Sequence, residues 1–228
     1  MTSSPRSVWG PTFDDISRKR GDTEAANSYF SVRNFRFLRN EVLRHLGDVK
    51  HKRILDVGCG TGHFLQPLAR ENFIVGIDVS PKMLAFARNK RLAVVQGPAE
   101  NLPFKSGSFD VVFANSVIQL IRDGSGFLKE LVRSVRPGGR IIISTINDGN
   151  VALAVLRRVE RKKYRHFRLY PFDELKALVA AAGGEMRTSL FLYFPFGKTR
   201  TIHGHKVSAS FPAGLPHLSS WRLSGRND

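Results

Sequence analysis

The sequence is poor in cysteine and in acidic residues, and it contains no long apolar run. Its 228 residues include one cysteine, which excludes an internal disulfide framework and a cysteine-rich zinc site. No segment approaches the roughly 18 consecutive apolar residues of a transmembrane helix, and the first residues lack the apolar stretch of a signal peptide. We therefore expect a soluble, cytoplasmic protein. Hydrophobic residues make up 42% of the chain, which is enough for the core of one domain.

The shortage of acidic residues leaves a formal net charge of +17. Residues 1–53 carry 11 basic and 6 acidic side chains (net +5), residues 54–150 carry 11 and 8 (net +3), and residues 151–228 carry 14 and 5 (net +9). Seven of the basic residues lie between Arg157 and Arg168. A basic surface suits an anionic partner such as RNA, an anionic lipid or an acidic carrier protein, but it is also a common solvated face.

Short apolar stretches alternate with helical patterns through the middle of the chain. Strands are expected over 53–57, 73–78, 92–96, 109–115 and 140–145. Helices are expected between them, from the first glycine-rich turn through Arg70, from Ser80-Pro81 onward, and over 127–135. This alternation predicts an α/β fold with a parallel sheet that is covered by helices on both faces.

The flanking segments are different in character. Residues 1–26 are polar and contain Gly10, Pro11 and Gly21, which indicates a loose start of the chain or a flap. Residues 27–46 have helical spacing of apolar residues and end at Gly47. Further helices over 151–167 and 171–182 and a strand over 186–194 complete the expected elements.

A glycine-rich turn follows the first expected strand. It reads Asp56-Val57-Gly58-Cys59-Gly60-Thr61-Gly62, and such a turn lets backbone atoms approach a ligand closely. Asp78 ends the second strand, 18 residues beyond Gly60, where an acidic side chain can accept hydrogen bonds from both hydroxyls of an adenosine ribose. Asp78 could instead cap the next helix. A dinucleotide site would need glycine at position 63, where this chain has His63, which argues against NAD.

The stretch Ile54–Leu65, ILDVGCGTGHFL, resembles motif I of the class I S-adenosylmethionine-dependent methyltransferases. It is similar to the type 11 subgroup typified by the quinone-pathway enzymes. Further motifs follow in the order of that family, at 76–84, 97–104, 108–112 and 131–139. The resemblance covers residues 27–195. It implies a Rossmann-like, doubly wound seven-stranded sheet that is mostly parallel, with an antiparallel last strand expected at 219–226.

The resemblance also implies a domain organisation. It describes a single methyltransferase domain over 1–228, with a helical cap over 1–50 and a cofactor-binding core over 51–147. Residues 148–170 would then form a basic lid insertion. Residues 171–228 would complete the sheet through a long connection at 196–217.

The cofactor implied by the resemblance is S-adenosylmethionine. Gly58, Cys59 and Gly60 would line its methionine part through backbone atoms, and Asp56 would hold the loop or reach the amino group through water. Asp78 would bind the ribose. The residues expected near the adenine or the methionine moiety are Val79, Met83, Pro98, Ala99, Glu100 and Asn115. The family often has Asp where this chain has Pro98, so Glu100 or the Ala99 backbone would have to serve in its place.

A sulfonium methyl group is already activated, so its transfer needs positioning more than acid–base chemistry. Where related enzymes often carry His after the fourth strand, this chain has Gln119, which can orient an acceptor but cannot take its proton. Tyr29 and Arg33 are candidates for substrate or cofactor contacts, unless these side chains only pack the helix. We assign no catalytic residue, because His63 is more simply interpreted as a residue at the solvent side of a helix. His203 and His205 are too few for a metal site, and no metal is expected.

Three functions fit these observations. The first is a methyltransferase for a small, apolar or amphipathic molecule. The excess of phenylalanine over tyrosine, 17 against 4, favours such an acceptor. The second is a methyltransferase that acts on RNA or on a substrate carried by an acidic protein, approached through the basic region 157–168. The third is a repurposed family member that binds the cofactor without methyl transfer. The excess charge lies outside the core, in the segments where this family recognises its substrates.

Overall fold

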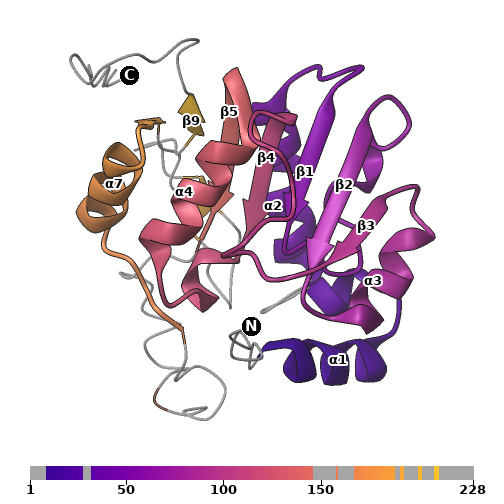
Figure 1. Ribbon diagram of the computed structural model, residues 1–228. Coiled ribbons are helices and arrows are strands. Elements are labelled where there is room, and N and C mark those ends of the chain that lie inside the picture. Colours follow the sequence, from indigo (N-terminus) through magenta and orange to yellow (C-terminus); the bar gives the residue numbers. More distant parts are fainter. Residues whose placement is uncertain are drawn as a thin grey trace, which may run out of the picture. The chain divides into compact units, whose positions relative to one another are not determined.

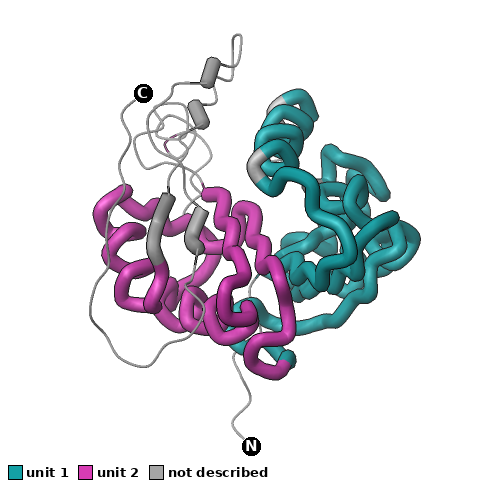
Figure 2. Tube along the Cα trace, turned by 90° about the horizontal axis from the view of Figure 1, so that it is seen from above, with its two compact units in different colours: residues 1–104 teal, residues 105–228 magenta. Residues whose placement is uncertain are grey.

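The computed structural model describes residues 9–27, 32–145, 158, 167–187, 191–192, 200–201 and 208–210 (Figure 1). The chain divides into two compact units, Met1–Phe104 and Lys105–Asp228, which Figure 2 shows in different colours. Within the described ranges, no helix is both long and apolar enough to span a bilayer. The alternation of strands and helices confirms the expected α/β class.

The first unit combines helices with a parallel sheet. Its strands are β1 (Arg53–Val57), β2 (Phe73–Asp78) and β3 (Ala93–Gln96), and its helices are α1 (Trp9–Arg20), η1 (Glu24–Asn27), α2 (Val32–Leu46), η2 (Gln66–Leu68) and α3 (Pro81–Arg88). β2 pairs in parallel with β1 on one side and with β3 on the other. The last four residues of β1 are all buried, as is typical of a parallel strand covered on both faces.

Strand register brings the two predicted ligand-binding segments together. Val57, the last residue of β1, lies opposite Ile77, the residue before the end of β2. Because paired parallel strands end at the same edge of a sheet, the loop after β1 and the carboxylate of Asp78 lie side by side. The expected start of the next helix is also confirmed, with Ser80 as its N-cap and Pro81 as its first residue.

The start of the chain differs from the prediction of a loose segment or flap. Residues Trp9–Arg20 form helix α1, which packs against α3. The polar sequence of α1 concealed this helix, because the contacts that hold it come from residues more than 60 positions away. Of the helix predicted over 27–46, the part from Val32 to Leu46 is present as α2, and Gly47 follows it with φ of 66°.

The segment after the glycine-rich loop is also different from the prediction. In place of a helix through Arg70, the chain makes turns and the short 3₁₀ segment η2, in which Leu68 N donates to Leu65 O over 2.9 Å. Pro67 lies within this segment. Proline has no N–H to donate and disfavours the α conformation in the residue before it, which explains the tighter turn.

The second unit contains a parallel pair of strands followed by shorter ones. Its elements are β4 (Phe109–Asn115), η3 (Ile118–Leu120), α4 (Gly124–Ser134), β5 (Val135–Ser144), α7 (Phe172–Ala181), β6 (Glu185–Arg187), β7 (Phe191–Leu192), β8 (Arg200–Thr201) and β9 (Ser208–Ser210). β4 and β5 are parallel, and β9 lies antiparallel between β5 and β6. α4 packs on β4, β5 and α7.

Two boundaries of the second unit correct the predictions. β5 begins at Val135, before the strand start that was expected at residue 140, and it includes Pro137, Gly138 and Gly139. The antiparallel strand beside β5 is Ser208–Ser210, inside the predicted connection 196–217, and the segment 219–226 expected in its place lies outside the described residues. Ser208, Ala209 and Ser210 have no apolar alternation that could have indicated a strand.

Candidate functional site

The loop after β1 wraps around the end of β2. Gly58, Gly60 and Gly62 have φ values of 70°, 53° and 78°, a left-handed conformation that only glycine adopts without strain. The N–H groups of Gly58 and Cys59 both donate to the carbonyl of Ile77, over 2.8 and 3.1 Å. These two donors therefore fasten the loop to β2, and a ligand that lies along the loop would meet other backbone atoms of these residues.

The side chain of Cys59 points into the core. It is 5% exposed and packs with Leu84 and Ala87 of α3, and burial raises the pKa of its thiol well above the usual value. It lies against Gly76 of β2, where an added Cβ would come within 2.7 Å of the sulfur. The thiol is therefore a packing group that anchors the loop, and the backbone role expected of Cys59 stays a prediction.

Asp78 ties the loop to the start of α3. Its Oδ2 accepts from Gly60 N and its Oδ1 accepts from Ser80 N, both over 2.9 Å. Burial raises the pKa of Asp78, and the hydrogen bonds from Ser80, Gly60 and Val79 lower it in part. Each carboxylate oxygen has a further lone pair, so Asp78 can hold the loop and still accept hydrogen bonds from two hydroxyls.

Asp56 is a buried carboxyl beneath the same loop. It is 2% exposed, and its Oδ2 has no hydrogen-bond partner among the residues that the structure describes. Burial, with a smaller contribution from the charge of Asp78, raises its pKa to about 8. A buried oxygen without a partner fits a ligand that brings its own donor, such as an ammonium group.

We predict that Asp56→Asn reduces the dependence of stability on pH. A carboxyl whose pKa is raised by folding favours the native state at low pH, and this contribution is lost as the pH rises from about 4 through about 8. Wild-type stability should therefore fall over that interval, and the variant should lose less. Urea unfolding at pH 5, 6.5 and 8 measures this. Asp78 contributes in the same direction, so part of the slope remains, but an unchanged slope would contradict the prediction.

The residues expected near the adenine surround the ends of β2 and β3. Val79 follows Asp78, and its carbonyl accepts from Gln96 Nε2 over 3.4 Å. Met83 is 1% exposed. Of the next segment, Pro98 and Glu100 are exposed and Ala99 is half-buried. Gly97 N donates to the carbonyl of Asp78 over 3.1 Å. This hydrogen bond fastens the segment after β3 to Asp78, the residue expected to bind the ribose.

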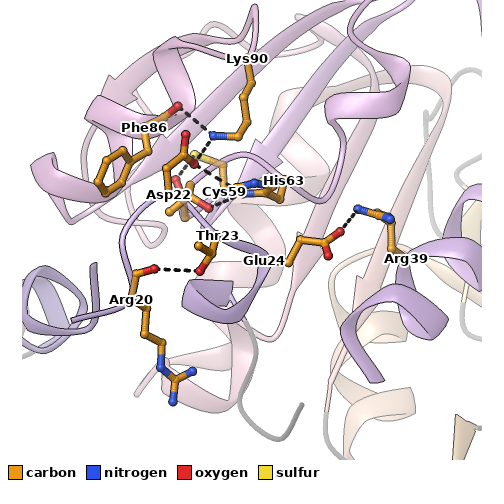
Figure 3. A network of polar contacts seen from close by, with 11 residues as sticks. Arg20, Asp22, Thr23, Glu24, Arg39, Cys59, His63, Phe86 and Lys90 are labelled. Atoms are coloured by element: carbon orange, nitrogen blue, oxygen red, sulfur yellow. Dashed lines mark hydrogen bonds and ion pairs between the residues drawn. The ribbon is translucent and has the colours of Figure 1, made fainter. Parts of the chain in front are cut away.

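His63 belongs to a network that connects the glycine-rich loop with the segment before α2 (Figure 3). Its Nδ1 lies 2.8 Å from Thr61 Oγ1 and 3.8 Å from Asp22 Oδ1. Lys90, whose side chain is 6% exposed, pairs with Asp22. Burial and the charge of Lys90 lower the pKa of His63. These contacts make His63 a half-buried connecting residue, in place of the exposed helix position that was predicted.

Further along the same segment, Glu24 accepts from Arg36 Nε over 2.5 Å and from Arg39 Nη1 over 2.6 Å. These hydrogen bonds lower the pKa of Glu24 against the effect of burial. Figure 3 shows Glu24 and Arg39 at one end of the network and Lys90 at the other. The segment before α2 is thus held both by α2 and by Lys90, which follows α3.

In the second unit, Asn115 ends β4 and Gln119 lies in η3, the next element along the chain. Gln119 is fully buried, and its Oε1 accepts from Thr145 Oγ1 over 3.1 Å. Its Nε2 and Asn115 Oδ1 are buried atoms for which the described residues supply no partner. Ser116, between them, has φ of 57°, a conformation that is uncommon outside glycine and concentrates at functional sites.

The remaining predicted positions lie partly within the described residues. Tyr29, His203 and His205 lie outside the described residues, and so does most of the basic region 157–168. Arg33 is an exposed residue of α2. At the end of the basic region, Arg168 is engaged with Glu174 through a 2.5 Å ion pair and lies over the ring of Tyr170 at 4.7 Å.

Asp14 is a residue near the site that no pattern in the sequence predicts. Its Oδ1 accepts from Ser80 Oγ over 2.5 Å, directly beside the ribose candidate Asp78. Asp14 stands in a polar stretch that resembles a loop, next to a second aspartate, Asp15, with the same local context. Nothing local distinguishes the two, so only the position of α1 against α3 could identify it.

Comparisons with known proteins agree with this geometry. Residues 55–143 match the family described as "Methyltransferase domain". The ubiquinone biosynthesis O-methyltransferase of Azorhizobium caulinodans is 36% identical over 172 residues, which are 66% of this chain and 68% of that protein. The malonyl-[acyl-carrier protein] O-methyltransferase of Erwinia pyrifoliae is 32% identical over 187 residues, 81% of this chain and 66% of that protein. The chain thus spans about two thirds of the length of these relatives.

Solved structures show the same fold. An S-adenosylmethionine-dependent methyltransferase of Thermotoga maritima, described as a possible histamine N-methyltransferase, has a TM-score of 0.69 at 24% identity, covering 87% of this chain and 99% of that one. The magnesium protoporphyrin IX methyltransferase of Synechocystis with bound S-adenosylhomocysteine has a TM-score of 0.68 at 18% identity, covering 90% and 97%. With its Rossmann-like fold, its glycine-rich loop and these relatives, the chain belongs to the class I S-adenosylmethionine-dependent methyltransferases, and it is similar to their quinone-pathway members.

Proposed function

We propose that this S-adenosylmethionine-dependent methyltransferase modifies a small, apolar or amphipathic molecule. The observation that carries the proposal is the shared position of Asp78, Asp56 and the glycine-rich loop at the ends of β1 and β2. Curated relatives that are named for ubiquinone and demethylmenaquinone methylation support a small-molecule acceptor. The excess of phenylalanine over tyrosine, 17 against 4, supports an apolar one.

Within the proposed site, Asp78 accepts hydrogen bonds from the ribose hydroxyls. Asp56 faces the ammonium group of the methionine part, which favours the ionised carboxylate and therefore lowers the pKa that burial raises. Gly58, Cys59 and Gly60 line this part through their backbone. Val79, Met83, Pro98, Ala99 and Glu100 surround the adenine, and Arg33 is assigned to the cofactor carboxylate. Asn115 is assigned to the methionine moiety.

The cofactor supplies a methyl group on a positively charged sulfur, and the protein has to orient the acceptor and exclude water. We assign Gln119 to orientation. Its oxygen is held by Thr145, and no described residue accepts from Nε2, so we assign the protons of Nε2 to the acceptor. An amide cannot remove a proton at neutral pH, so this assignment suits an acceptor atom that is already ionised or has a lone pair to share. Tyr29 remains a proposed contact of the acceptor.

A carrier-bound substrate is the second candidate. Malonyl-[acyl-carrier protein] methyltransferases are among the relatives, and a net charge of +17 suits an acidic carrier. In this version the basic region 157–168, of which Arg158 is exposed and helical, faces the carrier. RNA is the less favoured anionic partner, because the relatives cited are named for quinone or carrier-bound substrates.

The finer architecture also remains a proposal. The antiparallel pairing of β9 with β5 and β6 in the second unit supports a seven-stranded sheet of the methyltransferase type. The cap, core and lid boundaries at 1–50, 51–147 and 148–170 and the cytoplasmic location stay predictions.

The decisive experiment uses the purified protein with S-adenosylmethionine labelled in its methyl group. Demethylmenaquinone, malonyl-acyl carrier protein and bulk tRNA are offered in parallel, and transfer of label is followed together with calorimetric binding of S-adenosylhomocysteine. Label on demethylmenaquinone supports the main proposal, and label on malonyl-acyl carrier protein alone supports the second candidate. Cofactor binding without label transfer to any of the three contradicts both, and transfer to tRNA with a steep salt dependence would replace them with RNA.

A further inference from the structure

Helix α1 contacts the first turn of α3 through one carboxylate. Asp14 Oδ1 accepts from Ser80 Oγ over 2.5 Å and lies 3.4 Å from the backbone nitrogen of Lys82, which also donates to it. An aspartate here suits the first turn of a helix, where backbone N–H groups lack partners within the helix. Asp14 therefore supplements the cap of α3 from a different element.

Ser80 is the residue through which this contact reaches the cofactor site. It is fully buried. Its N–H donates to Asp78 Oδ1 over 2.9 Å, and its Oγ accepts from Met83 N over 3.1 Å while donating to Asp14. Because the backbone and the hydroxyl of Ser80 are both engaged, its position depends on all three partners. A shift of Ser80 would move the hydrogen bond that orients Asp78.

The chain of contacts continues into the glycine-rich loop. The second oxygen of Asp78 accepts from Gly60 N over 2.9 Å, so α1, α3, β2 and the loop form one series of hydrogen bonds. Gly10 of α1 also lies near this strand end. A Cβ added at Gly10 would be 3.6 Å from the carbonyl oxygen of Val79, the residue after Asp78. Helix α1 is thus seated beside Asp78 at two points one turn apart.

We propose that Asp14 is a positioning residue of the cofactor site: it holds Ser80, and through Ser80 it fixes the carboxylate of Asp78 for the ribose. The inference rests on the proposed role of Asp78 in cofactor binding. It assigns to the first helix, which has no predicted function, a part in cofactor affinity. Asp14 acts through hydrogen bonds and touches neither the acceptor nor the methyl group.

The test compares binding of S-adenosylhomocysteine to Asp14→Ala and to the matched control Asp15→Ala. Asp15 is the neighbouring residue on α1, where it pairs with Arg18 and Lys19 on the exposed side. We expect Asp14→Ala to raise the dissociation constant about tenfold, the size of one lost hydrogen bond to a charged group, and Asp15→Ala to leave it within twofold. Asp14→Asn, which retains an acceptor oxygen, should recover most of the affinity.

A double-mutant cycle with Ser80→Ala separates positioning from general loss of structure. If Asp14 acts through Ser80, adding Asp14→Ala to Ser80→Ala weakens binding no further. Should Asp14→Ala not fold, the same cycle is made with Asp14→Leu, which keeps the approximate size of the side chain and has no acceptor oxygen. In turnover, KM for S-adenosylmethionine should rise while kcat is kept. Additive losses, an unchanged dissociation constant, or an equal loss in Asp15→Ala would each overturn the proposal.

Failure of this inference can be told apart from failure of the proposed function. If the wild-type protein does not bind S-adenosylhomocysteine, the proposed function itself is wrong. If the wild-type protein binds and the Asp14 variants bind equally well, only the role of Asp14 is wrong, and α1 is then a structural helix.

Discussion

Replacing Asp78 by alanine is expected to weaken the binding of S-adenosylhomocysteine by about 100-fold or more. The substitution removes the acceptor for Gly60 N and for Ser80 N and the proposed acceptor for the ribose hydroxyls. Hydrogen bonds to a charged group each contribute about 1.5–3 kcal/mol, so the loss of two ribose contacts alone accounts for this factor. Isothermal titration calorimetry of the purified variant measures it.

Asp48→Ala is the matched control for this prediction. Asp48 is also an acidic residue of the first unit, but its side chain is 80% exposed and its pairing with Lys50 has a separation of 3.7 Å. Its removal changes the net charge equally and should leave the dissociation constant unchanged. Circular dichroism verifies that Asp78→Ala is folded at the temperature of the titration. An Asp78→Ala protein that binds within threefold of the wild type would show that the ribose is held elsewhere.

The second large effect is expected from Gly76→Ala, in the middle of β2. The new Cβ would lie 2.7 Å from Cys59 Sγ and 3.0 Å from Cys59 Cβ, closer than packed atoms allow. Cys59 cannot retreat easily, because it is packed against Leu84 and Ala87. We expect the free energy of unfolding to fall by about 3 kcal/mol, and the displaced loop to weaken cofactor binding at least about tenfold. Chemical denaturation and calorimetry measure the two effects.

Two further variants make this prediction specific to the contact. Gly10→Ala adds the same methyl group where the nearest atom, Val79 O, would be 3.6 Å away, so it should cost less than about 1 kcal/mol. Cys59→Ala removes the sulfur, so the double variant should recover part of the stability that Gly76→Ala loses. If Gly76→Ala unfolds at the same denaturant concentration as the wild type, the close packing of Cys59 on β2 is wrong.

The elements that the sequence predicted correctly are those whose signals are local. β2 and β4 begin and end where expected because each is a short apolar run that is bounded by polar or turn residues. The start of α3 follows from Ser80 and Pro81, whose capping and fixed φ act within a single turn. The errors in the first unit concern elements without such signals, namely the polar helix α1 and the turn around Pro67.

The features of the candidate site also divide into those with a local signal in the sequence and those that depend on tertiary contacts. The sequence by itself determined that a glycine-rich loop after β1 and an acidic residue at the end of β2 meet at one edge of a parallel sheet, because parallel register and left-handed glycines follow from residue type and spacing. Only the tertiary structure decided that the N–H groups of Gly58 and Cys59 both donate to Ile77, that Asp56 Oδ2 finds no hydrogen-bond partner among the described residues, and that Asp14 supports Ser80. Those outcomes depend on contacts between residues up to 66 positions apart. No local pattern encodes such contacts, because they arise only when packing brings the segments together.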